Sequence, residues 1–268
     1  MARLLSSLTA SRLVNRFDLQ NVKWVKTLVS VLFILCLMSP FSLSRVMAQD
    51  FSTMQQEMLR QIKQDTYLTR SATGIHELSD AVINAMSNVQ RHHFVSQPYR
   101  EYSYENRPLP IGHEQTISQP FIVALMTELL SPKASDRVLE VGTGSGYQAA
   151  ILATLVDKVY TIEIIPQLGK KAADRLSELG YNNVEVRVGD GYLGWPEQAP
   201  FDAIIVTAAA PEIPQPLIDQ LKKGGVLVMP VGGQNQPQQL VQLTKDIHGQ
   251  VTQKIVLAVR FVPLTGDH

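Results

Sequence analysis

Glycine recurs at every second position in a short stretch near the middle of the chain. Gly142, Gly144 and Gly146 follow an apolar run that ends at Val141, and a second apolar stretch comes after them. Glycine has no Cβ, so such a loop lets a ligand lie directly against the backbone. A dinucleotide fingerprint needs glycine at its first, third and sixth positions, and the sixth position counted from Gly142 is Tyr147. The spacing therefore disfavours a pyrophosphate cradle.

Acidic residues stand near the ends of three expected strands around this loop. Glu140 lies just before the loop, Glu163 ends the next expected strand, and Asp190 is followed by Gly191. An acid at the end of the second strand can accept both ribose hydroxyls of a nucleoside. We therefore expect Glu163 on the ribose and Asp190 near an adenine amino group. A solvated strand end for Glu163 and an ordinary Asx turn for Asp190 are the alternatives.

The two segments that would face a second substrate contain small or hydroxylated residues. Thr116 and Ser118 lie just before Pro120, and Ala208–Ala210 follow the fourth expected strand, where they leave room for a substrate backbone. Helix capping is the alternative for the two hydroxyls, and a tight strand-to-helix crossover is the alternative for the alanines. Arg260 could pair with a substrate carboxylate or with a structural acid.

Strand and helix patterns alternate from residue 137 onward, which predicts an α/β fold. A parallel sheet covered on both faces follows from short apolar strands separated by helices. His248-Gly249 marks a hairpin, so an antiparallel edge is expected at the C-terminal end. Helices are also expected at 51–65, 77–89 and 120–130, with an irregular stretch and short strands at 90–119. The expected strands are 137–141, 158–164, 184–190, 202–208, 225–231, 238–246 and 253–264, and the expected helices among them are 146–156, 166–179 and 214–222.

Composition limits the classes of function. The 268 residues are 45% hydrophobic, and Lys+Arg and Asp+Glu both number 24, so the formal net charge is zero. No global basic field exists to attract nucleic acid, which makes nucleic acid a disfavoured partner. The lone cysteine, Cys36, excludes an intramolecular disulfide, and the six histidines show no zinc spacing, so no metal is expected.

The first fifty residues differ from the rest. Five basic residues precede Thr27, and Leu28–Met38 is almost wholly apolar. This pattern is typical of a secretory signal with cleavage near Ala48-Gln49, and the apolar run is short for a membrane span. Translation from Met47 or Met54 is a second interpretation. The leader by itself favours export.

Several motifs occur together and in a fixed order. The segments LPIG, QTISQP, VLEVGTGSGYQAAILA, GDG, FDAIIVTAAAPEIP and VRFVPL resemble the protein-L-isoaspartate O-methyltransferase family over roughly residues 80–264. The resemblance implies a doubly wound, Rossmann-like fold that binds S-adenosyl-L-methionine. We expect a leader at 1–48, which is not a usual feature of the family, and one methyltransferase domain at 49–268, with a substrate-side segment (49–130) and a core (131–268). Because S-adenosyl-L-methionine is made in the cytosol, we expect a cytoplasmic protein in spite of the leader. The family commonly has glycine at the position of Glu114.

The resemblance also assigns roles to individual residues. It places the active-site hydroxyl at Ser118, within the segment Thr116-Ile117-Ser118. On the substrate side we expect Ile117, Ala208–Ala210 and Arg260. The resemblance gives the cofactor to Gly142, Gly144, Gly146, Glu163 and Asp190, and we add Glu140 and Gly191 as expected cofactor-binding residues.

The implied reaction agrees with a chain that shows no catalytic triad and no metal cluster. The acceptor would be the α-carboxylate of an L-isoaspartyl residue, or a D-aspartyl one, in a damaged protein. Such a group is ionised at pH 7 because carboxyl pKa values are near 4, so it needs no general base. Ser118 would orient it, alignment would supply most of the rate, and the ester would cyclise to a succinimide. A monomer is expected.

Two alternatives of other kinds stay open at this point. One is a methyltransferase that acts on another carboxylate or a small molecule, and the other is an exported, non-catalytic binding module. Methylation of small acids but not of isoaspartyl peptides would favour the first, and failure to bind S-adenosylmethionine would favour the second.

Overall fold

A computed structural model describes residues 40–233 and 236–266, and the side chains of 40–49 are not among the features described. The apolar run Leu28–Met38 and Cys36 therefore lie outside the described residues. Met1–Asp50 forms one unit of the chain and Phe51–His268 another. Within the described part of the chain, none of the helices has the length and apolar character needed to cross a membrane.

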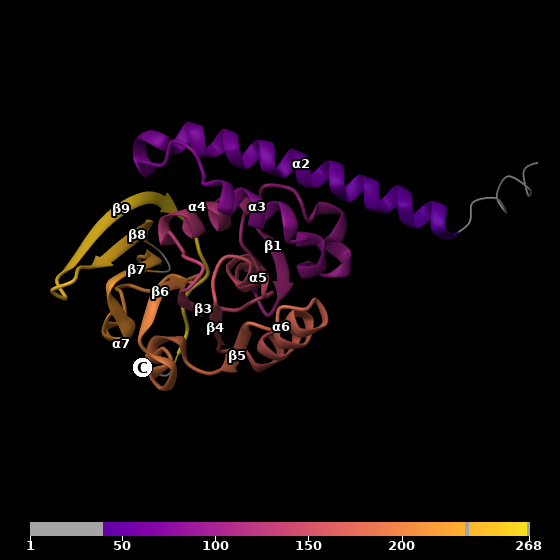
Figure 1. Cartoon of the computed structure of the whole chain (residues 1–268). Helices are drawn as coiled ribbons and strands as arrows, with labels where there is room; N and C mark the ends of the chain where they lie inside the picture. The colour runs from indigo at the N-terminus through magenta and orange to yellow at the C-terminus, as the bar shows by residue number, and fades with distance from the viewer. Residues whose placement is uncertain (1–39, 234–235, 267–268) are drawn as a thin grey trace, which may run out of the picture. The chain divides into compact units, whose positions relative to one another are not determined.

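A seven-stranded sheet dominates the described residues of the second unit (Figure 1). Its strand order is β5-β4-β3-β6-β7-β8-β9, and the pairs from β5 to β7 are parallel. This arrangement confirms the predicted doubly wound sheet. The strands are β3 (Arg137–Val141), β4 (Lys158–Glu163), β5 (Val184–Val188), β6 (Phe201–Val206), β7 (Leu221–Val231), β8 (Gln238–Lys245) and β9 (Val251–Val259).

Helices cover both faces of this sheet. The larger core cluster joins one face to helices α3 (Asp80–Asn88), α4 (Pro120–Leu130) and α5 (Tyr147–Ala153). The smaller cluster joins the other face to α7 (Gln215–Gln220) and to the 3-10 turn η3 (Gly191–Leu193). Alternate residues of a strand point to opposite faces, so Val138 enters the first cluster and Leu139 the second. Apolar side chains on both faces explain why the central strands read as continuous hydrophobic runs.

Local sequence signals fix where the helices begin and end. Proline occupies the first position of α4 and of α6 (Pro166–Glu178), where its missing N–H is not needed. Helix α6 ends in a Schellman motif, in which the N–H of Tyr181 donates to the carbonyl of Leu176 and Gly180 has φ +83°.

The C-terminal strands form the predicted antiparallel edge. Strand β8 pairs with β7 and with β9, and the β8–β9 turn lies at 246–250. Two predicted boundaries were wrong. Strand β7 begins at Leu221, directly after α7, and β9 ends at Val259 instead of continuing to residue 264. Arg260 and the residues after it therefore leave the sheet.

The N-terminal part of the second unit, from Phe51 onward, packs against the sheet as helices, short turns and a small hairpin. Helix α2 (Pro40–Thr73) is far longer than the predicted 51–65. The predicted irregular stretch contains the 3-10 turns η1 (Arg91–Phe94) and η2 (Gln97–Tyr102) and the antiparallel pair β1 (Leu109–Gly112) and β2 (Gln115–Ile117). The β1–β2 turn places Glu114 at φ +59°, a conformation that favours glycine, which is the residue that the family resemblance leads us to expect at this position.

Candidate functional site

The loops after β3 and β6 lie side by side at the carboxyl edge of the sheet. Strands β3 and β6 are neighbours in the sheet. The chain continues from β3 to β4 and β5 on one side of β3 and then crosses to β6 on the other side. Ligands bind in the crevice at such a switch point. The N–H of Thr207, just after β6, donates to the carbonyl of Val141 over 2.9 Å. This bond holds the two loops together.

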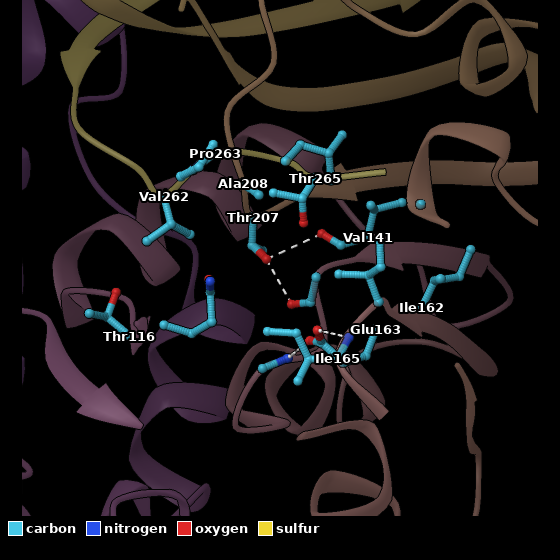
Figure 2. Close-up of a pocket in the computed structure, with 16 residues that line it drawn as sticks. Thr116, Val141, Ile162, Glu163, Ile165, Thr207, Ala208, Val262, Pro263 and Thr265 are labelled. Atoms are coloured by element: carbon cyan, nitrogen blue, oxygen red, sulfur yellow. Dashed lines mark hydrogen bonds between the residues drawn. The ribbon is translucent and has the colours of Figure 1, made fainter. Parts of the chain in front are cut away.

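The first glycine of the loop is required by this close approach. Gly142 has φ +100°, and a Cβ on it would lie 2.5 Å from Oγ1 of Thr207. The Thr207 hydroxyl donates to the carbonyl of Gly142 over 2.8 Å (Figure 2). A larger residue at position 142 would break this contact and reshape the crevice.

Glu163 lies at the end of β4 and points back under the loop. Its side chain is buried, and each carboxylate oxygen accepts a backbone N–H: Oε2 from Gly144 at 2.7 Å and Oε1 from Ile165 at 3.0 Å (Figure 2). A carboxylate offers about four acceptor positions, so Glu163 keeps capacity for hydroxyl donors of a ligand. Two backbone bonds fix its orientation toward the crevice before any ligand arrives.

The third glycine, Gly146, allows two helices to pack closely. Gly146 is the left-handed N-cap of α5, with φ +85°. A Cβ on it would lie 3.2 Å from Cδ1 of Leu176 in α6. The structure thus brings Gly142 and Gly144 to the crevice, whereas Gly146 lets α5 and α6 approach each other.

Glu140 lies below the loop and does not line the crevice. It is fully buried, its Oε2 accepts the hydroxyl of Thr161 at 2.6 Å, and Thr161 in turn pairs with Thr143 of the loop at 2.6 Å. The other oxygen, Oε1, has no partner among the described residues. Burial raises the pKa of Glu140 to about 8, since the charged form loses its hydration. The residue supports the loop from beneath.

A narrow pocket, which we call the loop pocket, occupies the crevice. Val141, Gly142, Gly144, Glu163 and Gly191 contribute to its wall. Its open volume is about 60 Å³, below the roughly 300–1,000 Å³ of typical small-molecule pockets. The C-terminal segment, residues 262–265, closes one side (Figure 2). The pocket in this conformation is therefore smaller than a nucleoside.

The C-terminal segment is held by the loop after β6 and reaches over Asp190. The N–H of Ala209 donates to the carbonyl of Val262, and the N–H of Leu264 donates to the carbonyl of Ala209. A Cβ on Gly266 would lie 2.5 Å from Oδ1 of Asp190. Asp190 caps η3 by accepting the N–H of Tyr192 at 2.9 Å. In this arrangement Gly191, and not Asp190, lines the loop pocket.

Ser118 lies between the β1–β2 hairpin and helix α4. The carbonyl of Ser118 accepts Nη2 of Arg91 at 2.7 Å, while Nε of Arg91 donates to the carbonyl of Ser103. Among the described residues, Oγ of Ser118 forms no hydrogen bond within the protein. The backbone of Ser118 is therefore fixed and its hydroxyl is available to a ligand.

Arg91, which holds the Ser118 carbonyl, has a fully buried guanidinium, and this is unusual for a charged side chain. It lies over the ring of Tyr147 with 4.8 Å between the guanidinium carbon and the ring centroid. Burial lowers the pKa of Arg91 to about 10, so the group stays charged at pH 7. A cation on an aromatic face and two charge-assisted hydrogen bonds offset part of its desolvation.

A larger cavity, which we call the outer pocket, adjoins the loop pocket. Its volume is about 660 Å³, and Ser118, Arg260 and residues of α2, α4 and β9 line it. Thr116, Thr207 and Val262 line both pockets (Figure 2 labels all three). A ligand in the loop pocket and another in the outer pocket would therefore meet at these three residues.

Several residues that we predicted to bind the substrate do not line the outer pocket. Ile117 packs into the larger core cluster, and Ala210 is buried in the smaller one. Ala209 is also buried and holds the C-terminal segment. Of the three alanines only Ala208 lines a pocket, on the loop side. The predicted Ser118, Thr116 and Arg260 do come together in the outer pocket.

Sequence reasoning missed three residues that the structure places at the site: Thr207, Val262 and Arg91. Thr207 lies one position before the predicted alanines, and its hydroxyl could have marked it as a candidate site residue. Arg91 had no local signal, because its partners lie 12 and 27 positions away. No cluster of three or more metal-ligating side chains occurs within the described part of the chain.

Comparisons with known proteins agree with this geometry. Residues 56–268 match the family model of protein-L-isoaspartate(D-aspartate) O-methyltransferase. Protein-L-isoaspartate O-methyltransferase 2 of Syntrophobacter fumaroxidans is 56% identical over 79% of this chain and 86% of the relative. The enzyme of the same name from Nitrosococcus oceani is also 56% identical, over 79% of this chain and 96% of the relative.

A solved structure with a similar fold also matches this chain. It is a chain from Plasmodium falciparum described as a candidate protein-L-isoaspartate O-methyltransferase, in complex with S-adenosyl-L-homocysteine. The match has a TM-score of 0.65 and 26% identity, and it covers 79% of this chain and 98% of that one.

Proposed function

The chain belongs to the protein-L-isoaspartate(D-aspartate) O-methyltransferase family, and on this premise we propose which of its residues perform the reaction. The enzyme transfers a methyl group from S-adenosyl-L-methionine to the free carboxylate of isoaspartyl residues, which starts the repair of damaged proteins. The observation that carries the residue assignment is the meeting of two pockets at Thr116, Thr207 and Val262.

The donor set of the loop pocket fits S-adenosylmethionine. The pocket combines a buried carboxylate, Glu163, with glycine backbone and apolar walls at Val141 and Ile162. A Cβ on Gly191 would lie 2.3 Å from Cγ1 of Val141, so only glycine keeps this wall in place. We assign Glu163 to the ribose hydroxyls and the backbone at Gly142 and Gly144 to the rest of the cofactor. Asp190 would reach the adenine end once the C-terminal segment shifts.

The outer pocket would hold the isoaspartyl peptide. When bound, the cofactor supplies an electrophilic methyl group: the new bond joins this carbon to a carboxylate oxygen, and the electron pair of the broken bond stays on sulfur. The protein needs no base, because the carboxylate is already ionised. Its task is alignment, which can contribute on the order of 7 kcal/mol or more.

We assign the alignment to hydroxyls and one cation at the outer pocket. Ser118 Oγ would donate to the carboxylate oxygen that does not react, and Thr116 would restrict the peptide at the junction of the pockets. Arg260 lines the same pocket and would attract the carboxylate before transfer. Arg91 would act indirectly, because it holds the carbonyl of Ser118 in place.

The experiment that tests this assignment compares Ser118→Ala with wild type. We expect a turnover of isoaspartyl peptide at least tenfold lower, because a hydrogen bond to a charged group is lost, and an unchanged dissociation constant for the cofactor. Ser177→Ala, at an exposed position of α6, is the matched control. Equal turnover of Ser118→Ala and wild type would contradict the assignment.

Acceptor competition separates this function from the alternative of a small-molecule methyltransferase. Labelled S-adenosylmethionine is offered together with an isoaspartyl peptide and an excess of free small carboxylic acids. We expect the label in the peptide. Label in the small acids alone would favour the alternative, and it would leave the roles of the loop-pocket residues unaffected.

Location and assembly are further parts of the proposal. We propose a monomer that acts in the cytoplasm, where S-adenosylmethionine is made, on proteins and not on nucleic acid. Support comes from the cofactor requirement and the zero formal net charge. N-terminal sequencing of the protein purified from fractionated cells tests the location. A mature N-terminus at Gln49 in an exported fraction would contradict it.

A further inference from the structure

The outer pocket has a carboxylate on its wall that the methyl transfer does not use. Asp65 and Thr69 of α2 line this pocket, on an element that contributes nothing to the loop pocket. The other charged residue that lines it is Arg260, which follows β9. The pocket therefore presents one negative and one positive group from two separate elements.

Asp65 is fixed in place, and no cation in the described part of the chain forms a salt bridge with it. Its Oδ2 accepts Nδ2 of Asn106 at 2.7 Å. Asn106 in turn accepts the backbone N–H of Phe121 at 3.0 Å, through Oδ1, at the start of α4. One carboxylate oxygen is thus engaged, whereas Oδ1 accepts no hydrogen bond from the described residues, and the side chain lines the outer pocket. The side chain is half-buried, which reduces screening by solvent.

The pocket is also larger than the reacting residue. Its volume of about 660 Å³ is several times the space of one aspartyl side chain, so it has room for residues next to the isoaspartyl linkage as well. If Arg260 attracts the reacting carboxylate, Asp65 remains to interact with a neighbouring side chain of the peptide.

We propose that Asp65 is a specificity-determining residue that favours isoaspartyl sites flanked by lysine or arginine. The inference rests on the proposed function, because it concerns the peptide in the outer pocket. A flanking cation would gain a salt bridge with Asp65, whereas a flanking carboxylate would be repelled by it. The effect adds to the recognition of the isoaspartyl group and does not replace it.

The test uses three peptides that differ only at the two residues on either side of one isoaspartyl linkage: lysine, glutamine or glutamate. For wild type we expect kcat/KM to be about tenfold higher for the lysine peptide than for the glutamate peptide, which corresponds to attraction and repulsion near the upper range of exposed ion pairs. The ratio should decrease as the salt concentration rises. A ratio near one, or a preference for glutamate, would overturn the inference.

Variants assign the preference to Asp65. Asp65→Asn removes the charge but can still accept the Asn106 amide, and we expect the lysine-to-glutamate ratio to fall to about two or less. Thr69→Lys adds a cation to the same wall while Asp65 and Asn106 keep their bond, and it should lower the ratio as well. Glu57→Gln, an acid of α2 outside the pocket, is the control and should keep the wild-type ratio. An undiminished ratio in both pocket variants would contradict the role of Asp65.

The outcomes also separate this inference from the proposed function. Methylation of all three peptides at one rate would overturn the charge preference and leave the function intact. Failure to methylate the glutamine peptide, which carries no flanking charge, would overturn the function, and the inference would fall with it. A loss in Asp65→Asn that is equal for all three peptides would show that Asp65 acts only through Asn106 and α4, which also contradicts the inference.

Discussion

The backbone N–H of Gly144 donates to Oε2 of Glu163 over 2.7 Å. This bond joins the glycine loop after β3 to the end of β4, the two features that the sequence offers as a cofactor site. The loop is therefore ordered by the same carboxylate that we assign to the ribose. Loss of Glu163 would remove a ligand contact and release the loop at the same time.

Substitution of Glu163 should weaken cofactor binding. For Glu163→Ala we expect a dissociation constant for S-adenosylmethionine about 10- to 100-fold higher, because hydrogen bonds to a charged group contribute about 1.5–3 kcal/mol. Isothermal titration measures the constant. Glu185→Gln is the control, since Glu185 pairs with Lys158 away from the pocket. An unaltered constant in Glu163→Ala would contradict the ribose assignment.

Arg91 should matter for both stability and turnover. Arg91→Met leaves the carbonyls of Ser103 and Ser118 without their donors, so we expect a loss of about 2–5 kcal/mol in the free energy of unfolding. Urea denaturation measures this loss. In the folded fraction, kcat should fall while cofactor affinity changes little, because the loop pocket is not touched. A decrease in cofactor affinity equal to that in kcat would show that Arg91 has no specific link to Ser118.

The buried Glu140 should make stability depend on pH. Its folded pKa of about 8 exceeds the ordinary value of 4.5, so the folded state binds the proton more tightly than the unfolded state. This contribution to stability is complete below pH 4.5 and is lost as the pH rises to 8. Glu140→Gln removes the titration, so relative to wild type the variant should gain stability between pH 5 and pH 8, by an amount on the order of a few kcal/mol.

Denaturation of wild type and Glu140→Gln at several pH values measures the difference. The comparison is needed because His92 titrates with the opposite sense: burial lowers its pKa to about 4, so its contribution is present above pH 6.5 and is lost as the pH falls. A pH-independent difference between the two proteins would contradict the assignment of the raised pKa to Glu140.

The C-terminal segment should take part in cofactor binding. Residues 262–265 line the loop pocket, and the backbone of Ala209 holds them. Removal of residues 262–268 should therefore raise the dissociation constant of S-adenosylmethionine, while Leu264→Ala, which keeps the backbone, should have a smaller effect. Circular dichroism checks that both proteins are folded. An unchanged constant in the folded, shortened protein would show that the segment is not part of the site.

Much of the fold could be predicted because local patterns determine it. Apolar runs at the spacing of strands and helices gave the order of elements from residue 137 onward, and Pro120 and Pro166 marked two helix starts. The end of β9 could not be read this way, because residues 261–264 are as apolar as a strand, but Val262 and Leu264 bond to Ala209 in the loop after β6. Helix α2 has a polar sequence overall, and its buried residues Met58 and Ile62 pack in the larger core cluster.

The candidate site was predictable to a similar degree. Glycine spacing and strand ends gave Gly142, Gly144 and Glu163, which do line the loop pocket. Glu140 and Gly146 also lie at positions expected for cofactor-binding residues. However, Glu140 is buried below the loop, and Gly146 lies between α5 and α6. Asp65 and Arg91 could not have been found, since the residues they contact lie far away in the sequence.

The most direct test of the account is methyl transfer to two peptides that are identical except for one isoaspartyl linkage in place of an aspartyl one. The purified protein is incubated with labelled S-adenosylmethionine and each peptide, and base-labile methyl groups are counted. The account predicts label in the isoaspartyl peptide alone. Equal labelling of both peptides, or label in neither while the cofactor is bound, would contradict it.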